Sequence, residues 1–320
     1  MSVTGCAGAS TGTPQVTPYT VNTMTLTAKS TATDIDFGAM FEKHRESIDR
    51  ASAELERDDA PASSSGDPKV VFIVQRGRGG DVVQAGCVRK RNGRLKRYSA
   101  NVFENQATLV VRMPSGTHTN VKLFRNGHVQ MTGSRSEKEG RVAAELVVSM
   151  AAAHSSCPGR HSAGVGPVNV CLMNSDFRIT GGRVDRQALY EVATDVLGIQ
   201  GSFQPAIYPA VKCFYMWRPE TADGSNKCLP YPRPGLVGPD RGMHPDLRPT
   251  ARDCNGVCPL HGSGGSGSGC DGKGCCKRVT ILIFHTGATI VTGGVSEHQI
   301  RACHEWVSSL CALHGDKFFL

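Results

Sequence analysis

The chain has 320 residues, a formal net charge of +8, 39% hydrophobic residues and 13 cysteines. This length allows a substantial buried core and suits two halves of similar design. The longest apolar runs are strand-sized, so no membrane-spanning helix is expected, and residues 1–20 lack the apolar core of a secretory signal. We therefore expect an intracellular protein whose cysteines are thiols or metal ligands rather than a disulfide framework.

The positive charge is concentrated in one stretch. Between Arg76 and Arg97 lie eight basic residues and a single acidic one, a net +7 out of the chain's +8. Such a cluster is typical of a phosphate-binding surface, and equally of a solvated loop. The residues that would contact phosphate are Arg89, Lys90, Arg91, Arg94, Lys96 and Arg97.

The first half begins with a low-complexity tail, residues 1–15, which we expect to be disordered. Residues 17–29 alternate polar and apolar side chains, which predicts a half-buried strand, and residues 34–56 have helical apolar spacing. The remaining strand patterns of this half lie at 69–74, 81–88 and 101–113. The first two of these predict a hairpin that carries the basic cluster.

The second half follows a connector, residues 155–167, and repeats the order of elements. GPVNVCLMNSDFRI predicts a strand, and residues 184–198 predict a helix that ends on Gly198. FQPAIYPAVKCFYMW predicts a turn and then a strand. Residues 218–277 interrupt the pattern with Pro, Gly and Cys, and the last helix is expected to end near His314.

A repeated segment, LFRNGHVQMTG at 123–133 and IFHTGATIVTG at 283–293, organises the chain. The residues that match with an offset of 160 are Phe124 and Phe284, Gly127 and Gly287, Thr132 and Thr292, and Gly133 and Gly293. Each copy predicts a hairpin with Gly at its turn. A helix then begins with a capping box, at Ser136 and at Ser296.

Each half therefore reads strand, helix, strands, helix. Antiparallel strands with helices on one face make an α+β layer, and its duplication predicts one continuous sheet with helices on one side. The opposite face is left bare, and we expect a partner to bind there.

The repeated motifs resemble those of the TATA-box-binding protein family. LFRNGHVQMTGSRSE and ILIFHTGATIVTGG resemble that family's two Phe-turn-Gly-strand-Thr-Gly signatures, VNTM and VNVC its two Asn strands, and QPAIYPAV its aromatic-Pro loop. The resemblance implies an α+β saddle. Two pseudo-symmetric repeats would form one curved antiparallel sheet, with helices on the convex side and the concave side in the DNA minor groove, a binding mode for which this family is a standard example.

The resemblance covers two repeats, residues 16–154 and 168–320, on either side of the connector. The first would contain a basic insertion at about 58–100 and the second a Cys, Gly and Pro-rich insertion at about 218–277. The DNA-binding residues that it implies are Asn22, Met24, Phe124, Thr132, Asn169, Cys171, Tyr208, Leu282, Phe284, Ile290 and Thr292.

Within that set, the resemblance implies that Phe124, Tyr208 and Phe284 insert between base steps, while the Asn and Thr residues donate to base acceptors. The fourth wedge position falls on Gln106, and two further groove positions fall on Lys122 and Gln130. Phenylalanines in strands are also commonly core residues. The family's acidic pair for transcription factor B falls on Gln204 and Ala206, so the sequence leaves open whether this factor is bound.

The second insertion is rich in potential metal ligands. Cys254, Cys258 and His261, with Cys270 as a distal fourth ligand, have spacings compatible with a structural zinc. A metal would order a Gly-rich loop that has no core of its own. The competing interpretation is a disordered loop with free thiols. No cofactor is required by the rest of the chain.

The resemblance implies a general transcription factor that bends A·T-rich promoter DNA and nucleates initiation-complex assembly. Its partners would be double-stranded DNA, initiation factors and the RNA polymerase machinery, with no membrane. It would act as a monomer on DNA, in the nucleus or, for a viral protein, the viral replication compartment. The alternative is a protein-interaction module or transcription regulator of the same fold without sequence-specific DNA binding. No enzyme is expected, because no nucleophile motif or phosphate loop stands out.

Overall fold

The computed structural model describes residues 14–57, 66–77, 79–88, 102–156, 164–199, 201–217, 229–230 and 277–320. These residues form antiparallel strands and four α-helices, so the α+β class predicted from the sequence is confirmed. The chain divides into two compact units. Unit 1 comprises residues 1–21 and 173–320, and unit 2 comprises residues 22–172.

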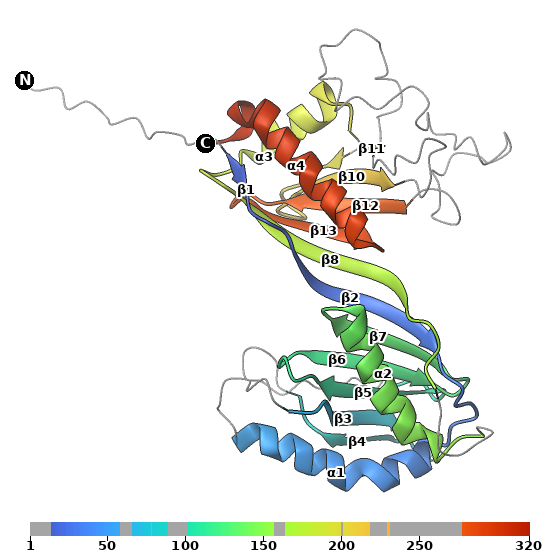
Figure 1. The fold of residues 1–320 in the computed structure, drawn as a ribbon. Coiled ribbons are helices and arrows are strands. Elements are labelled where there is room, and N and C mark those ends of the chain that lie inside the picture. Colours follow the sequence, from blue (N-terminus) through green and yellow to red (C-terminus); the bar gives the residue numbers. More distant parts are fainter. Residues whose placement is uncertain are drawn as a thin grey trace, which may run out of the picture. The chain divides into compact units, whose positions relative to one another are not determined.

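Unit 2 is an antiparallel sheet with helices against one face. Its strand order is β2, β7, β6, β5, β3, β4. The strands are β2 (Thr20–Lys29, in this unit from Asn22), β3 (Lys69–Arg76), β4 (Val82–Gly86), β5 (Gln106–Arg112), β6 (His118–Phe124) and β7 (His128–Ser134). Helix α2 (Glu137–Ala152) lies against β6 and β7, and α1 (Phe37–Arg57) against β3 and β4 (Figure 1).

Unit 1 has the strand order β8, β13, β12, β10, β11, with β1 paired to β8 and β9 to β10. The strands are β1 (Gln15–Val16), β8 (Asn169–Thr180, in this unit from Met173), β9 (Gly201–Ser202), β10 (Val211–Trp217), β11 (Leu229–Pro230), β12 (Lys277–Ile283) and β13 (Ala288–Gly294). Helix α4 (Glu297–Phe318) lies against β13 (Figure 1). The helix predicted at 184–198 is shorter and two-part, α3 (Arg186–Glu191) and a π-helical turn η1 (Val192–Val196).

The repeated segment has the same local structure in both units. The hairpin turns place Gly127 at φ 81° and Gly287 at φ 76°, in the left-handed region that only glycine adopts at little cost. Each following helix has a serine N-cap: Ser136 Oγ accepts from Glu139 N, and Ser296 Oγ from Gln299 N. The serine half of each predicted capping box is therefore formed, while the side chains of Glu139 and Gln299 accept from Arg135 N and Val295 N, one residue before the cap.

Buried side chains on alternate strand positions show which face the helices cover. In unit 2, Leu26 and Met131 are Cα partners and are fully buried, and Leu26 Cδ1 lies against Gly140 of α2. In unit 1, the Tyr215 ring of β10 lies 5.8 Å from the Trp306 ring of α4. The intervening positions of each sheet point away from the helices. We call that side the helix-free face of the unit.

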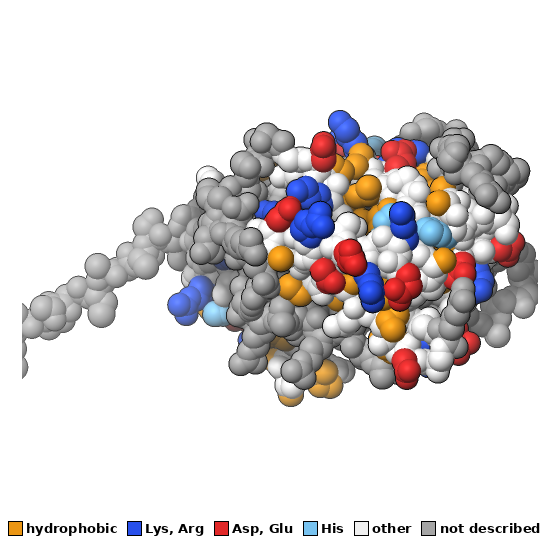
Figure 2. All heavy atoms as spheres, turned by 90° about the horizontal axis from the view of Figure 1, so that it is seen from below, with side chains coloured by type: hydrophobic (Ala, Val, Ile, Leu, Met, Phe, Trp, Pro, Cys, Tyr) orange, Lys and Arg blue, Asp and Glu red, His pale blue; other side chains and the backbone are white. Residues whose placement is uncertain are grey.

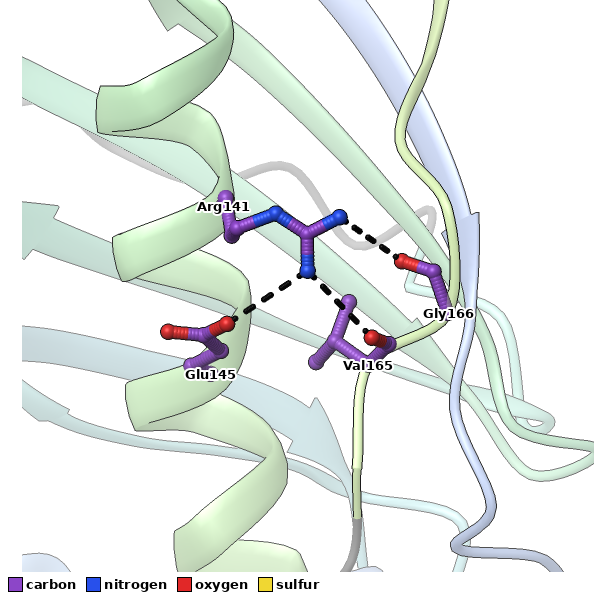
Figure 3. Close-up of polar contacts among 4 residues, drawn as sticks. All are labelled: Arg141, Glu145, Val165 and Gly166. Atoms are coloured by element: carbon purple, nitrogen blue, oxygen red, sulfur yellow. Dashed lines mark hydrogen bonds and ion pairs between the residues drawn. The ribbon is translucent and has the colours of Figure 1, made fainter.

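Arg141 of α2 fastens the segment that leads into β8 (Figure 3). Its Nη1 donates to the Val165 carbonyl at 3.4 Å and its Nη2 to the Gly166 carbonyl at 3.2 Å, while Nη1 also lies 3.5 Å from Glu145 Oε1. Gly166 N in turn donates to the carbonyl of Lys29 at the end of β2. The guanidinium thus connects α2 to the chain beside the end of β2.

One face of the molecule carries side chains of mixed charge. Figure 2 shows acidic and basic side chains interspersed, with hydrophobic ones scattered between them, on the face seen from below. Of the helices in the described ranges, none is long and apolar enough to cross a membrane.

Candidate functional site

The helix-free face of unit 1 exposes apolar side chains along three neighbouring strands. Phe214 of β10, Leu282 of β12 and Ile290 of β13 are each partly exposed. The residues immediately before and after each of them are buried. The pairings Leu282 with Lys212 and Leu282 with Ile290 place these side chains on one surface. An uncovered apolar strip of this kind is typical of a binding surface.

Two aromatic rings lie together at the hairpin end of this face. The rings of Tyr208 and Phe284 have centroids 6.1 Å apart, and Lys212 Nζ lies 4.7 Å from the Tyr208 centroid. Both aromatic residues are partly exposed. The structure therefore brings together two of the residues that the sequence paired as wedges, and it places a cation beside them.

Polar groups line β8 next to the apolar strip. Thr292 Oγ1 donates to Asn174 Oδ1 at 2.5 Å, which leaves the Asn174 amide N–H groups as donors. Asp176 and Arg178 are exposed on the same face, since their Cα partners are Ile290 and Ala288. Arg178 Nη1 donates to the Thr286 carbonyl at 2.8 Å.

The sequence reasoning missed Asn174 and Asp176. It selected Asn169 from the motif VNVC, whereas the asparagine beside Thr292 lies five residues later in the same strand. The alternation of buried Met173, Ser175 and Phe177 with their neighbours was the available signal. Met and Phe on one phase of a strand favour that phase as the core side, which leaves Asn174 and Asp176 on the other.

The helix-free face of unit 2 is polar where its strands correspond to those of unit 1. Gln130 has Thr27 and Lys122 as Cα partners, and Thr132 has Thr25 and Asn120. All six residues are partly exposed. Phe124 is also partly exposed, and its ring lies 6.0 Å from that of His128. Thr132 and Phe124 thus lie on the helix-free face, as the sequence analysis expected.

The outer part of that face is covered by the protein's own chain. Phe72 and Val74 of β3 and Val110 of β5 point away from the helices, yet each is at most 2% exposed. They belong to one buried cluster, Val71, Phe72, Val74, Val88, Val102 and Val110. Val88 and Val102 are the described residues on either side of 89–101, so the chain at these two positions packs on this face.

Gln106, at the start of β5, is also buried. It is the Cα partner of Phe124, but it is only 5% exposed, and its Nε2 donates to Thr108 Oγ1 at 3.4 Å. The counterpart of the Tyr208 and Phe284 pair is therefore one partly exposed ring, Phe124, beside a buried amide.

Two residues of the first Asn strand differ from expectation. Met24 was expected to face the groove, but it is only 8% exposed and lies on the same strand phase as buried Leu26 and Ala28, toward the helices. Asn22 is exposed but shares that phase. The positions of β2 that reach the helix-free face are Thr25 and Thr27, because Thr25 pairs with Thr132.

Asn169 and Cys171, at the start of β8, are both exposed and belong to unit 2. Cys171 Sγ lies 3.3 Å from Thr27 Oγ1, which places it beside the helix-free face of that unit. The five cysteines in the described ranges are free thiols. Cys213 is buried within unit 1. Burial raises the pKa of its thiol to about 12, so the thiol stays protonated at neutral pH.

Two groups of predicted site residues lie outside the described residues. They are the basic residues Arg89, Lys90, Arg91, Arg94, Lys96 and Arg97, and the zinc candidates Cys254, Cys258, His261 and Cys270. Within the described ranges, no group of three or more His, Cys, Asp or Glu side chains could hold a metal ion.

Comparison with known proteins finds no matching family model and no matching curated protein. Among solved structures, Methanococcus jannaschii TBP is similar, with a TM-score of 0.39 and 12% sequence identity over 92% of this chain and 98% of that one.

Proposed function

We propose that the protein binds and bends A·T-rich double-stranded DNA through the minor groove, in the manner of a TATA-box-binding transcription factor. The observation that carries the proposal is the partly exposed pair Tyr208 and Phe284 at the edge of the apolar strip on unit 1. Aromatic or aliphatic side chains presented in this way can enter a base step of a widened minor groove, and their stacking offsets part of the cost of unstacking.

The polar groups of the face suit the same ligand. A·T pairs present only acceptors in the minor groove, so a face that reads them needs donors. Asn174 provides amide N–H donors next to Thr292, and Thr25 and Thr27 provide hydroxyls on unit 2.

Charge on the helix-free faces also favours a phosphate-rich partner. Lys212 and Arg178 lie on the helix-free face of unit 1, and Lys122 lies on the helix-free face of unit 2. Among the described strand residues of these faces, Asp176 carries the one carboxylate. Cationic side chains that border an apolar surface are suited to the backbone on either side of a groove.

A protein-interaction role is the second candidate, and the buried outer strands of unit 2 favour it. Phe72, Val74 and Val110 cannot touch DNA while Val88 and Val102 cover them. A factor that still uses the rest of its sheet for DNA should nevertheless bend its target, whereas a protein-binding module should not.

The test is binding of the purified protein to an A·T-rich duplex and to a G·C-rich control, each labelled at both ends so that energy transfer reports the bend. We expect tighter binding to the A·T-rich duplex together with a shorter end-to-end distance. Measurement at two salt concentrations separates the minor-groove contribution from phosphate contacts, because phosphate contacts weaken steeply with salt. Sequence-independent binding without bending would contradict the proposal and support the protein-interaction role.

The same assay tests the basic residues at 89–97, which lie outside the described residues. If Arg89, Lys90 and Arg91 contact phosphate, changing all three to Gln should reduce the dependence of binding on salt and leave the base-sequence preference unchanged. An unchanged salt dependence would show that these residues do not contact DNA.

A further inference from the structure

Asp176 is an unexpected group on a surface that would enter a minor groove. It is exposed on the helix-free face of unit 1, in the same cross-strand row as Ile290 and Leu282. A carboxylate is an acceptor only. Adenine N3 and thymine O2 are also acceptors, so an A·T pair offers this side chain no hydrogen bond.

Among the described residues, this carboxylate has no partner. The Asp176 side chain makes no hydrogen bond or ion pair within the described ranges, although its backbone pairs with Ile290 in the sheet. Two cations whose side chains are described on the same face have other contacts, since Arg178 Nη1 donates to the Thr286 carbonyl and Lys212 Nζ lies over the Tyr208 ring. When the face is pressed against a ligand, a charge without a partner is costly. The ligand must therefore supply a donor at this point.

One base group in the minor groove is a donor, the 2-amino group of guanine. We propose that Asp176 is a specificity-determining residue that accepts a hydrogen bond from this amino group. The face of unit 1 then selects one G·C pair within an otherwise A·T-rich site. This inference rests on the proposed function, and it adds a base preference that the apolar strip alone would not produce.

The neighbouring residues are consistent with reading at the level of single base pairs. Asn174, two residues earlier on β8, has its carbonyl oxygen occupied by Thr292 and so presents N–H donors to a base acceptor. Two neighbouring positions on this face of β8 thus present a donor at Asn174 and an acceptor at Asp176. The position of unit 2 that corresponds to Asp176 is Thr27, because Thr27 pairs with Gln130 and Asp176 pairs with Ile290. Thr27 carries a hydroxyl that can donate or accept a hydrogen bond. Of these two corresponding positions, the one in unit 1, Asp176, is thus the one whose side chain can only accept a hydrogen bond.

The test is a scan in which each A·T pair of the best A·T-rich duplex is replaced in turn by G·C. We expect one position at which G·C binds about tenfold more tightly than A·T, which is the usual range for a single base-pair change. Two base analogues isolate the amino group. Inosine·C at that position, which lacks the amino group, should lose the gain, and 2,6-diaminopurine·T, which adds it to an A·T-like pair, should restore it.

Variants of Asp176 connect this preference to the side chain. Asp176→Val should abolish the G·C preference at that position, and a strand favours Val, so the fold should tolerate the change. Asp176→Asn keeps an acceptor and adds a donor, and should bind both base pairs similarly. Asp316→Asn removes an exposed carboxylate from α4, on the helix-covered side, and should leave the preference unchanged.

The outcomes separate the two hypotheses. Bending with a preference for A·T at every position would overturn the inference and leave the proposed function intact, as would a G·C preference that survives Asp176→Val. Failure to bind any duplex preferentially would overturn both.

Discussion

At the scale of single residues, Phe284 is the most informative position on the helix-free faces. Its ring is partly exposed and lies beside Tyr208, so we expect its removal to cost less stability than removal of a fully buried ring. Stacking of a base on an aromatic side chain is worth about 1–3 kcal/mol. We therefore predict that Phe284→Ala weakens binding of A·T-rich DNA at least about fivefold and reduces the bend, both measured by end-to-end energy transfer.

The matched control is Leu313→Ala, since Leu313 is 39% exposed on α4 and does not lie on the helix-free face. It should change neither affinity nor bend, and both variants should unfold near the wild-type temperature. A Phe284→Ala protein that still bends DNA fully would remove the wedge role from this residue.

The residue scale also shows where sequence reasoning failed. In the strand TVNTMTLTAK, threonines alternate with Met24, Leu26 and Ala28 from Thr23 to Ala28, so the sequence shows the strand period clearly. Because of Asn22, the sequence analysis assigned DNA binding to the strand positions that also include Met24 and Leu26. The apolar residues Met24, Leu26 and Ala28 on that phase of the strand were the available signal that it faces the core, and the pairing of Thr25 with Thr132 confirms which phase reaches the helix-free face.

At the scale of elements, the repeated hairpin and helix were predicted closely because their signals are local. The glycines at the turns and the serine caps act within a few residues, and they fix the same structure in β6, β7 and α2 as in β12, β13 and α4. The helix at 184–198 was less well predicted. Its pattern did not indicate the change from α3 to the π-helical turn at Val192.

The attachment of α2 to the segment before β8 gives a prediction at this scale. Arg141 donates to two backbone carbonyls at 3.4 and 3.2 Å, but its side chain is 41% exposed, so solvent screens part of the gain. Arg141→Ala should lower the free energy of unfolding by about 1 kcal/mol in urea denaturation, because these acceptors then lose a charged donor. Arg141→Lys should recover only part, since an ammonium cannot reproduce the planar fork.

The control for this change is Arg45→Ala on α1. Arg45 lies 3.5 Å from Glu42 in a surface pair with a side chain 52% exposed, and such pairs contribute little. Equal destabilisation by Arg45→Ala and Arg141→Ala would show that the carbonyl contacts of Arg141 add nothing beyond a surface charge.

At the scale of the whole molecule, the two units have the same order of strands around the repeated hairpin but different helix-free faces. Unit 1 combines an apolar strip with an aromatic pair, whereas unit 2 has Gln130 and Lys122 in place of the strip and a self-covered outer part. The polar substitutions were visible in the sequence. The cover was not, because Val88 and Val102 are separated from each other by residues 89–101 and join one buried cluster only in the folded chain.

This difference predicts that a wedge cannot be restored in unit 2 by a single substitution. Gln106 is the Cα partner of Phe124, but it is 5% exposed beside Thr108. Gln106→Phe should therefore overpack a closed site, lowering the free energy of unfolding by about 1–3 kcal/mol, and leave the bend unchanged. Gln130→Val, at a partly exposed strand position, is the control and should keep its stability. An increased bend in Gln106→Phe would mean that the cover over β5 opens when DNA binds, and that unit 2 can carry a second wedge.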